Sequence, residues 1–260
     1  RILPEVKEWQ SRPLNSLYPF VFMDAIHYKV RDEGRIVSKA AYIVLGVTTE
    51  GYKDILSITV GANESSKFWL GMLNDLKNRG VQDVLFFCVD GLPGFRDAIQ
   101  TVFPQAQIQR CIIHMLRNSF KYVNYSDLKK FASDFKAVYN ASTEEMGKLE
   151  LETLKGTWGK KYPYAIRSWE DNWEDLSSFY QFSGELRKIM YTTNIIEGVN
   201  RQYRKATKNK SVFPNDASLA KMLYLASQNV MKKWTQRYRG WDQVIGQLIL
   251  LYGERLTQYL

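Results

Sequence analysis

The sequence predicts an α/β fold in which a mixed sheet is flanked by helices and interrupted by an all-helical insertion. The apolar run over residues 84–89 ends abruptly at Asp90-Gly91, a pattern typical of a strand buried on both faces. Residues 20–62 contain three more strand patterns joined by short turns. Residues 125–190 contain no strand pattern, and their apolar side chains recur at helical spacing.

The first three strands are expected to form an antiparallel meander. Residues 20–30 predict the first strand, and the turn sequence Asp32-Glu33-Gly34 predicts a hairpin to a second strand over residues 38–48. A third strand is predicted over residues 54–62, after Glu50-Gly51. Short loops between successive strands favour pairing of neighbours in the sequence.

Helices and strands alternate in the next part of the chain. We expect a helix over residues 65–79, the strand at 84–89, a helix over 92–102, a short strand within 106–113 and a helix through Arg117 and Phe120. This order is that of the ribonuclease H-like fold, and its crossovers place the fourth strand parallel beside the first.

The predicted domain organisation has four segments. Residues 1–19, which are polar and contain three prolines, are expected to form an arm or linker. Residues 20–124 form the first part of the ribonuclease H-like core, 125–190 the all-helical insertion, and 191–260 the last part of the core with its C-terminal helices. Those helices are expected near residues 216–234 and 241–256.

Composition indicates a globular protein with a polyanionic partner. The chain has 260 residues, of which 45% are hydrophobic, and a formal net charge of +9. Nucleic acid is the favoured partner, and a solvated basic surface is the alternative. Two cysteines make no disulfide framework, and no apolar run approaches the roughly 18 residues of a membrane span, so a reduced, intracellular, soluble protein is expected. The chain begins at Arg1 without a Met, and we expect it to be a fragment of a longer one.

Two aspartates are candidate site residues. Asp90 is the first charge after the central strand, at the edge where open α/β sheets bind ligands, although Asp-Gly is also a common turn. Asp24 alternates with Phe22 and Ile26, so the strand pattern carries its carboxylate toward a dry interior. Such a carboxylate either pairs with a buried Lys or Arg or binds a divalent metal.

Residues 191–210 predict a helix with one apolar face and one charged face. Ile196, Val199 and Tyr203 share the first face, while Glu197 shares the second with basic residues. Arg201, Arg204 and Lys208 are the basic residues of that face, and together with Lys205 and Lys210 they are the candidate DNA-binding residues. An acid among cations suits a metal site beside a phosphate backbone. The alternative is a capping box, because Asn194 precedes Glu197 by three residues.

Two further groups of residues are assigned mainly to structure. Trp158, Trp169 and Trp173 of the insertion are expected in its core, with stacking on an unpaired base as the alternative. Cys111 and His114 could form half of a zinc site, but no second pair has ligand spacing. Packing and a hydrogen bond between strand and helix are the favoured interpretation of this pair.

Three runs, DGLPGF, QRCIIHMLRN and YTTNIIEGVNRQYRKATKNKSVFP, resemble bacterial insertion-sequence transposases of the Mutator type, a DDE family on the ribonuclease H-like fold. The resemblance covers residues 20–256. It implies that Asp24 and Asp90 are the two catalytic aspartates and Glu197 the catalytic glutamate. Cys111 and His114 match the family's C-x-x-H signature. An all-helical insertion before the last catalytic helix is also a family feature.

The resemblance implies metal-dependent DNA cleavage and strand transfer. Asp24, Asp90 and Glu197 would hold two Mg²⁺ or Mn²⁺ ions, for which carboxylates are suitable ligands. The implied partners are the element ends and the target DNA, with a homodimer or larger assembly on DNA and no membrane. The implied location is the bacterial cytoplasm, associated with the nucleoid. A domain that recognises element ends is expected before Arg1, so this chain is expected to bind DNA with little sequence preference.

Other functions are compatible with part of the pattern. A nuclease or junction resolvase would use the same three acids. A catalytically silent DNA-binding protein would not need three clustered acids beside phosphates. A glycosidase could use paired carboxylates, but it does not explain the basic helix.

Overall fold

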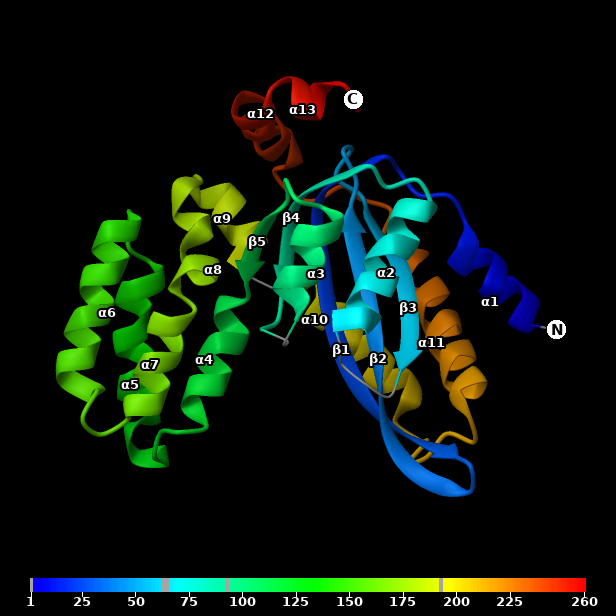
Figure 1. Cartoon of the computed structure of the whole chain (residues 1–260), viewed down its shortest axis with the longest axis horizontal. Coiled ribbons are helices and arrows are strands. Elements are labelled where there is room, and N and C mark those ends of the chain that lie inside the picture. The colour runs from blue at the N-terminus through cyan, green and yellow to red at the C-terminus, as the bar shows by residue number, and fades with distance from the viewer. Residues whose placement is uncertain (1, 62–65, 92–93, 192–193) are drawn as a thin grey trace. The chain divides into compact units, whose positions relative to one another are not determined.

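The computed structural model describes residues 2–61, 66–91, 94–191 and 194–260. The chain divides into two compact units (Figure 1). The first unit contains residues 1–107 and 194–260, and the second contains residues 108–193. Among the described residues, no helix combines the length and the apolar character needed to cross a bilayer.

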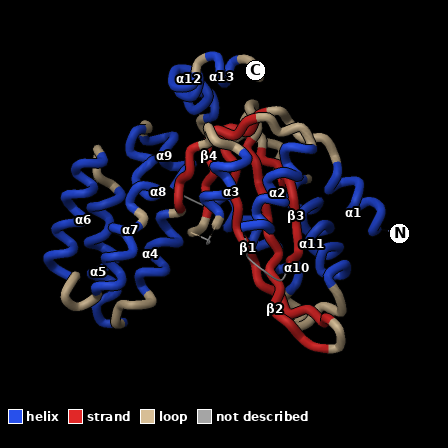
Figure 2. Tube along the Cα trace, in the orientation of Figure 1, coloured by secondary structure: helices blue, strands red, loops and turns tan. Residues whose placement is uncertain are grey.

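The sheet has five strands in the order β3-β2-β1-β4-β5, drawn in red in Figure 2. They are β1 (Leu17–Asp32), β2 (Arg35–Val47), β3 (Lys53–Gly61), β4 (Asp83–Val89) and β5 (Gln107–Arg110). Strand β1 pairs antiparallel with β2, which pairs antiparallel with β3. Strand β4 pairs parallel with β1. The predicted mixed sheet and the predicted neighbour of the first strand are therefore confirmed.

The hairpin between β1 and β2 has a shorter loop and longer strands than predicted. Only Glu33 and Gly34 form its loop, with φ angles of 46° and 80°, and Asp32 pairs with Arg35. Two central residues with positive φ match the right-handed twist of the strands, and glycine adopts that conformation readily. At its other end β1 includes Pro19, which precedes Phe20, the first residue paired with β2. A proline is tolerated there because it needs no hydrogen bond to that partner.

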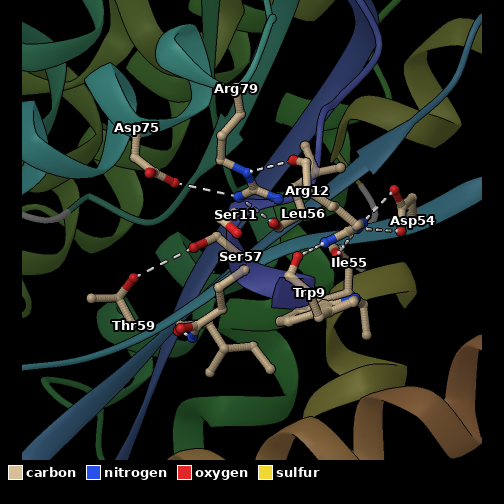
Figure 3. A network of polar contacts seen from close by, with 12 residues as sticks. Trp9, Ser11, Arg12, Asp54, Ile55, Leu56, Ser57, Thr59, Asp75 and Arg79 are labelled. Carbon is tan, nitrogen blue, oxygen red and sulfur yellow. Dashed lines mark hydrogen bonds and ion pairs between the residues drawn. The ribbon is translucent and has the colours of Figure 1, made fainter. Parts of the chain in front are cut away.

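The segment predicted as an arm contains a helix, α1 (Ile2–Ser11), which its sequence did not indicate. The chain after α1 is held by two arginines (Figure 3). Arg12 lies 3.0 Å from the Asp54 carboxylate, and the Arg79 guanidinium donates to the carbonyls of Arg12 and Leu56. These contacts link residues far apart in sequence, so local patterning could not predict them.

Helices cover both faces of the sheet, as Figure 1 shows for α2 (Ser66–Asn78) and α3 (Phe95–Val102) in front and for α10 (Asn194–Thr207) and α11 (Asp216–Met231) behind. Trp69 of α2 is buried between Tyr42 of β2 and Phe95 of α3. On the other face, α10 contacts β1 and α11 contacts β3. Helix α3 begins at Phe95 rather than at residue 92, and residues 92–93 lie outside the described part of the chain.

The C-terminal helix predicted over residues 241–256 is two helices, α12 (Trp241–Tyr252) and α13 (Glu254–Thr257). Gly253, with a φ of 49°, separates them. Trp241 packs against Phe20, and its Nε1 donates to the Thr49 carbonyl at 2.8 Å. Gly51 lies directly under this indole with a φ of 90°, so both space and backbone conformation require glycine there.

The second unit is helical after the end of β5. Its helices are α4 (Ile112–Phe120), α5 (Tyr125–Tyr139), α6 (Glu144–Trp158), α7 (Pro163–Asp171), α8 (Trp173–Ser177), the 3-10 helix η1 (Ser178–Gln181) and α9 (Gly184–Tyr191). The described residues between 125 and 190 contain no strand, as predicted. This unit also includes α4, because Trp169 of α7 donates to Ser119 at 2.9 Å. The limits of the insertion as a domain stay a prediction.

Candidate active site

Asp24 and Asp90 occupy equivalent positions on neighbouring parallel strands. Met23 of β1 pairs with Val89, the last residue of β4. Asp24 directly follows Met23, and Asp90 directly follows Val89. Neighbouring strands lie about 4.8 Å apart, so this register sets the two aspartates side by side. Both side chains are half-buried. The strands β2, β3 and β4 and the helix α2 lie between these two acids in the sequence, and the folded sheet brings the acids together.

The Asp24 carboxylate is oriented by hydrogen bonds to both of its oxygens. Oδ1 accepts the backbone N–H of Ala25 at 2.8 Å, and Oδ2 accepts from Nδ2 of Asn200. Phe22 and Ile26, which alternate with Asp24 along β1, are buried. The half-buried carboxylate consequently lies at the edge of an apolar layer, less enclosed than the dry interior that the sequence predicted, and is held in a defined orientation.

Helix α10 supplies the third predicted acid. Ile196, Val199 and Tyr203 are buried, which confirms the predicted apolar face. Glu197 is half-buried and lies three residues before Asn200. Side chains three apart on a helix are neighbours, with Cβ atoms about 5–6 Å apart. Because Asn200 contacts Asp24, which lies in the middle of β1, Glu197 belongs to the stretch of α10 that neighbours this contact.

Asn200 is the residue that the sequence analysis missed. Its side chain is 2% exposed, and its Oδ1 atom has no hydrogen-bond partner within the described residues. A buried amide is expected to have partners for both of its polar atoms. The sequence signal was the Glu-x-x-Asn spacing, which aligns two polar side chains on one face of an otherwise amphipathic helix.

A hydrogen bond between buried side chains fixes α10 against α11. The hydroxyl groups of Tyr203 and Ser227 lie 2.6 Å apart, and burial raises the pKa of Tyr203 above its usual range. The phenol therefore stays protonated at neutral pH and can act as a donor. This contact, together with the burial of Ile196 and Val199, holds α10 against its neighbours.

The predicted cationic residues are exposed but do not all belong to the helix. Arg201, Arg204 and Lys205 lie on α10, and all three are exposed. The helix ends at Thr207, so Lys208 and Lys210 lie in the turn that follows and not on a helical face. The assigned helix ends one residue before Lys208, and the alignment of Lys208 with Glu197 stays a prediction. The side chain of Asn194, on which the capping-box alternative depends, lies outside the described residues.

Cys111 and His114 belong to the second unit, where Cys111 starts helix α4. Cys111 is buried at the N-cap position, and its Sγ accepts the backbone N–H of His114 at 3.4 Å. This contact ends β5 at Arg110, so the strand is shorter than predicted. A capping contact of this kind explains a cysteine at position 111, and it involves only the backbone of His114. The role of the His114 side chain stays a prediction.

The insertion tryptophans have mainly structural contacts. Trp158 and Trp169 are 7% and 1% exposed, and their indole N–H groups donate to Asp134 and Ser119. Trp173 is half-buried and donates to Glu144. The core interpretation is supported for the first two residues.

Comparisons with known proteins agree on one family. The model described as "Transposase, Mutator family" matches residues 1–237. The probable transposase for an ISRM3-like insertion sequence element of Sinorhizobium fredii is 43% identical over 256 residues, which cover 98% of this chain and 64% of that protein. The transposase for ISRM3 of Rhizobium meliloti is also 43% identical, with the same coverage. A probable insertion sequence transposase of Corynebacterium diphtheriae is 37% identical and is covered over 81% of its length.

The chain spans 64% of the length of the first two relatives. Among solved structures, the Drosophila P element transposase strand transfer complex is 11% identical and matches with a TM-score of 0.29, over 98% of this chain and 76% of that one. A match at this level supports no comparison of sites.

Proposed function

Because the chain belongs to the Mutator family of transposases, we propose that it is the catalytic part of a DNA transposase that cleaves and joins DNA strands at Asp24, Asp90 and Glu197. Two observations support this proposal. The β1–β4 register sets Asp24 and Asp90 at equivalent positions of neighbouring strands, and Asn200, three residues after Glu197 on α10, donates to Asp24.

The donor set fits divalent cations. Asp24, Asp90 and Glu197 would hold Mg²⁺ or Mn²⁺, two ions in this proposal, because carboxylate oxygens are the ligands that these hard ions prefer. When bound, such ions activate water or a 3′-hydroxyl and stabilise charge on the attacked phosphate. Half-burial of the acids limits the water around them, which strengthens their attraction for a cation.

The chain's own residues position the acids and the DNA. The Ala25 N–H and Asn200 orient Asp24, so its side chain loses its conformational entropy when the protein folds and not when a ligand binds. The exposed cations of α10 and its following turn, Arg201, Arg204, Lys205, Lys208 and Lys210, would bind phosphates beside the acids. Cys111 would act by capping the start of α4.

The proposed partners are the element ends and a target DNA, with a dimer or larger assembly formed on them. A nuclease or junction resolvase remains the alternative activity, because the acids alone do not distinguish hydrolysis from joining. The family match favours transposition.

A strand-transfer assay tests the function. The full-length protein is incubated with Mn²⁺, labelled duplexes that carry candidate element ends, and a plasmid target, and joined products are expected. Glu197→Gln should abolish cleavage and joining while changing the free energy of unfolding by no more than about 0.5 kcal/mol, because it removes the charge and keeps the shape. Wild-type activity in this variant would exclude Glu197 as the third acid. Cleavage without joining by the unmodified protein would favour the nuclease.

A further inference from the structure

The first unit contains a pocket that shares only Lys205 with the residues of the proposed function. It has a volume of about 560 Å³, within the range of about 300–1,000 Å³ typical of small-molecule sites. Helices α10 and α11, the first residue of β3 and the segment after α11 line it. Its floor is apolar and includes Val199, Ala226 and Val230.

Cations, amides and one indole form the polar part of the pocket. Lys53, Lys205 and Lys233 line it, and none of its described lining residues is acidic. Burial lowers the pKa of Lys53, so a bound anion would relieve the cost of keeping that ammonium charged. Lys53 Nζ lies 5.2 Å from the centre of the Trp234 ring, so a cation and an aromatic surface occur together.

These groups match the chemistry of a nucleotide. A phosphate is recognised by converging lysines, and a base is recognised by an aromatic surface and by amides that can bind its edge. Gln202 and Asn229 supply amides at the pocket. A simple inorganic anion would use the lysines but would leave the indole and the apolar floor without a role.

We propose that this pocket, here called the Trp234 pocket, binds one unpaired nucleotide of the DNA strand engaged by the acidic site. The inference rests on the proposed function, because the strand must already lie along α10. Gly198, which lines the pocket, directly follows Glu197, and Lys205 lies two turns further along the same helix. A strand that reaches Glu197 therefore passes the entrance, and an unpaired base can enter without the cost of breaking a base pair.

Gly198 allows the pocket to be filled without disturbing its walls. Apart from its chain neighbours and the nearby backbone of its own helix, no atom lies within 4 Å of a Cβ atom placed at Gly198, and the same is true of Gly71 in α2. Gly198→Met should therefore occlude the pocket, and Gly71→Met is a matched control. Trp9→Ala is the control for Trp234→Ala, because Trp9 is also half-buried, with the Arg12 guanidinium 4.7 Å from its ring centre, but does not line the pocket.

The test measures binding of two probes to the 260-residue chain by fluorescence anisotropy, with EDTA present so that no cleavage occurs. One probe is a blunt duplex, and the other is the same duplex with a short single-stranded thymidine overhang. The wild-type chain is expected to prefer the overhang by at least about fivefold, the lower end for one stacked base. Trp234→Ala and Gly198→Met should remove this preference and leave blunt-duplex binding unchanged. Trp234→Phe should retain most of it.

The outcomes separate this inference from the proposed function. Equal binding of both probes by the wild-type chain, or an overhang preference that survives in Trp234→Ala and Gly198→Met, overturns the Trp234 pocket alone. Loss of the preference in Trp9→Ala or Gly71→Met to the same degree also overturns it, because the effect would then not be specific to the pocket. Failure of the wild-type chain to bind either probe counts against the proposed function itself.

Discussion

Asn200 connects two parts of the candidate site that are 176 residues apart in the sequence. Its Nδ2 donates to Asp24, while its Oδ1 is buried without a partner among the described residues. Leaving a buried acceptor unsatisfied costs roughly 1–3 kcal/mol, so stability alone does not explain an amide here. An asparagine side chain is neutral, so it can donate a hydrogen bond to a carboxylate without neutralising the negative charge. We therefore expect Asn200 to position Asp24.

Asn200→Asp tests this role because it replaces the donor by a second carboxylate. At pH 7 we expect the free energy of unfolding to fall by about 1–3 kcal/mol, since two carboxylates would face each other. Their repulsion raises the pKa of the pair in the folded state, so the loss of stability should shrink as the pH falls toward 5 and one proton is shared. Urea unfolding at both pH values measures this. Asn209→Asp, on an exposed residue, should show neither effect, and an equal loss at both pH values would argue against a carboxylate contact.

Helix α10 combines a packing face with a charged face within a few turns. Buried Ile196, Val199 and Tyr203 anchor it, and this leaves Arg201, Arg204 and Lys205 exposed. The helix ends at Thr207, and the turn that follows it carries Lys208 and Lys210, which are also exposed. The five cations therefore follow one another along the exposed part of α10 and its following turn.

The salt dependence of DNA binding tests this surface. Replacing Arg204 and Lys208 by Ala should reduce the slope of log K against log salt by about two units, because each lost phosphate contact removes about 0.9 unit. A double variant in which Lys148 and Lys160 become Ala has the same change in net charge, and both lysines are exposed in the second unit. Its slope should stay at the wild-type value. If the slope is unchanged when Arg204 and Lys208 are replaced, these two residues do not contact DNA phosphates.

At the scale of the whole molecule, the three predicted acids all belong to the first unit, although Glu197 follows the second unit in the sequence. After β5 the chain forms the helices α4 to α9 and then returns to provide α10. The acids are thus brought together only when the segments on both sides of the second unit have folded. Metal binding should consequently stabilise the folded first unit as a whole.

Thermal unfolding with and without divalent metal measures this linkage. Mg²⁺ or Mn²⁺ at about 100 times its dissociation constant should stabilise the protein by about 2.7 kcal/mol, because the ion binds the assembled acids and not the unfolded chain. Asp24→Asn should abolish the response. Asp97→Asn, at an exposed position of α3, should retain it. A full metal response in Asp24→Asn would show that the ions bind at another place.

The sequence by itself determined the features that depend on neighbouring residues. The buried strand before Asp90, the Glu33-Gly34 turn, the helical segment at 125–190 and the apolar face of α10 all follow from side-chain periodicity or turn chemistry acting over a few residues. The order of these elements was enough to predict the mixed sheet and the parallel pairing of β1 with β4. The family followed from three motifs and agrees with the comparisons.

Only the tertiary structure decided features that depend on distant residues. Helix α1 is followed by a segment fixed by Arg12 and Arg79, and Asn200 acquires a role only because α10 lies against Asp24. The Trp234 pocket likewise arises from the packing of α10 against α11. The roles of the three acids and of the cations stay predictions from the sequence. Periodicity determines which face of an element is buried, whereas the partner of that face is determined by the whole chain, because packing free energy depends on contacts that no local window contains.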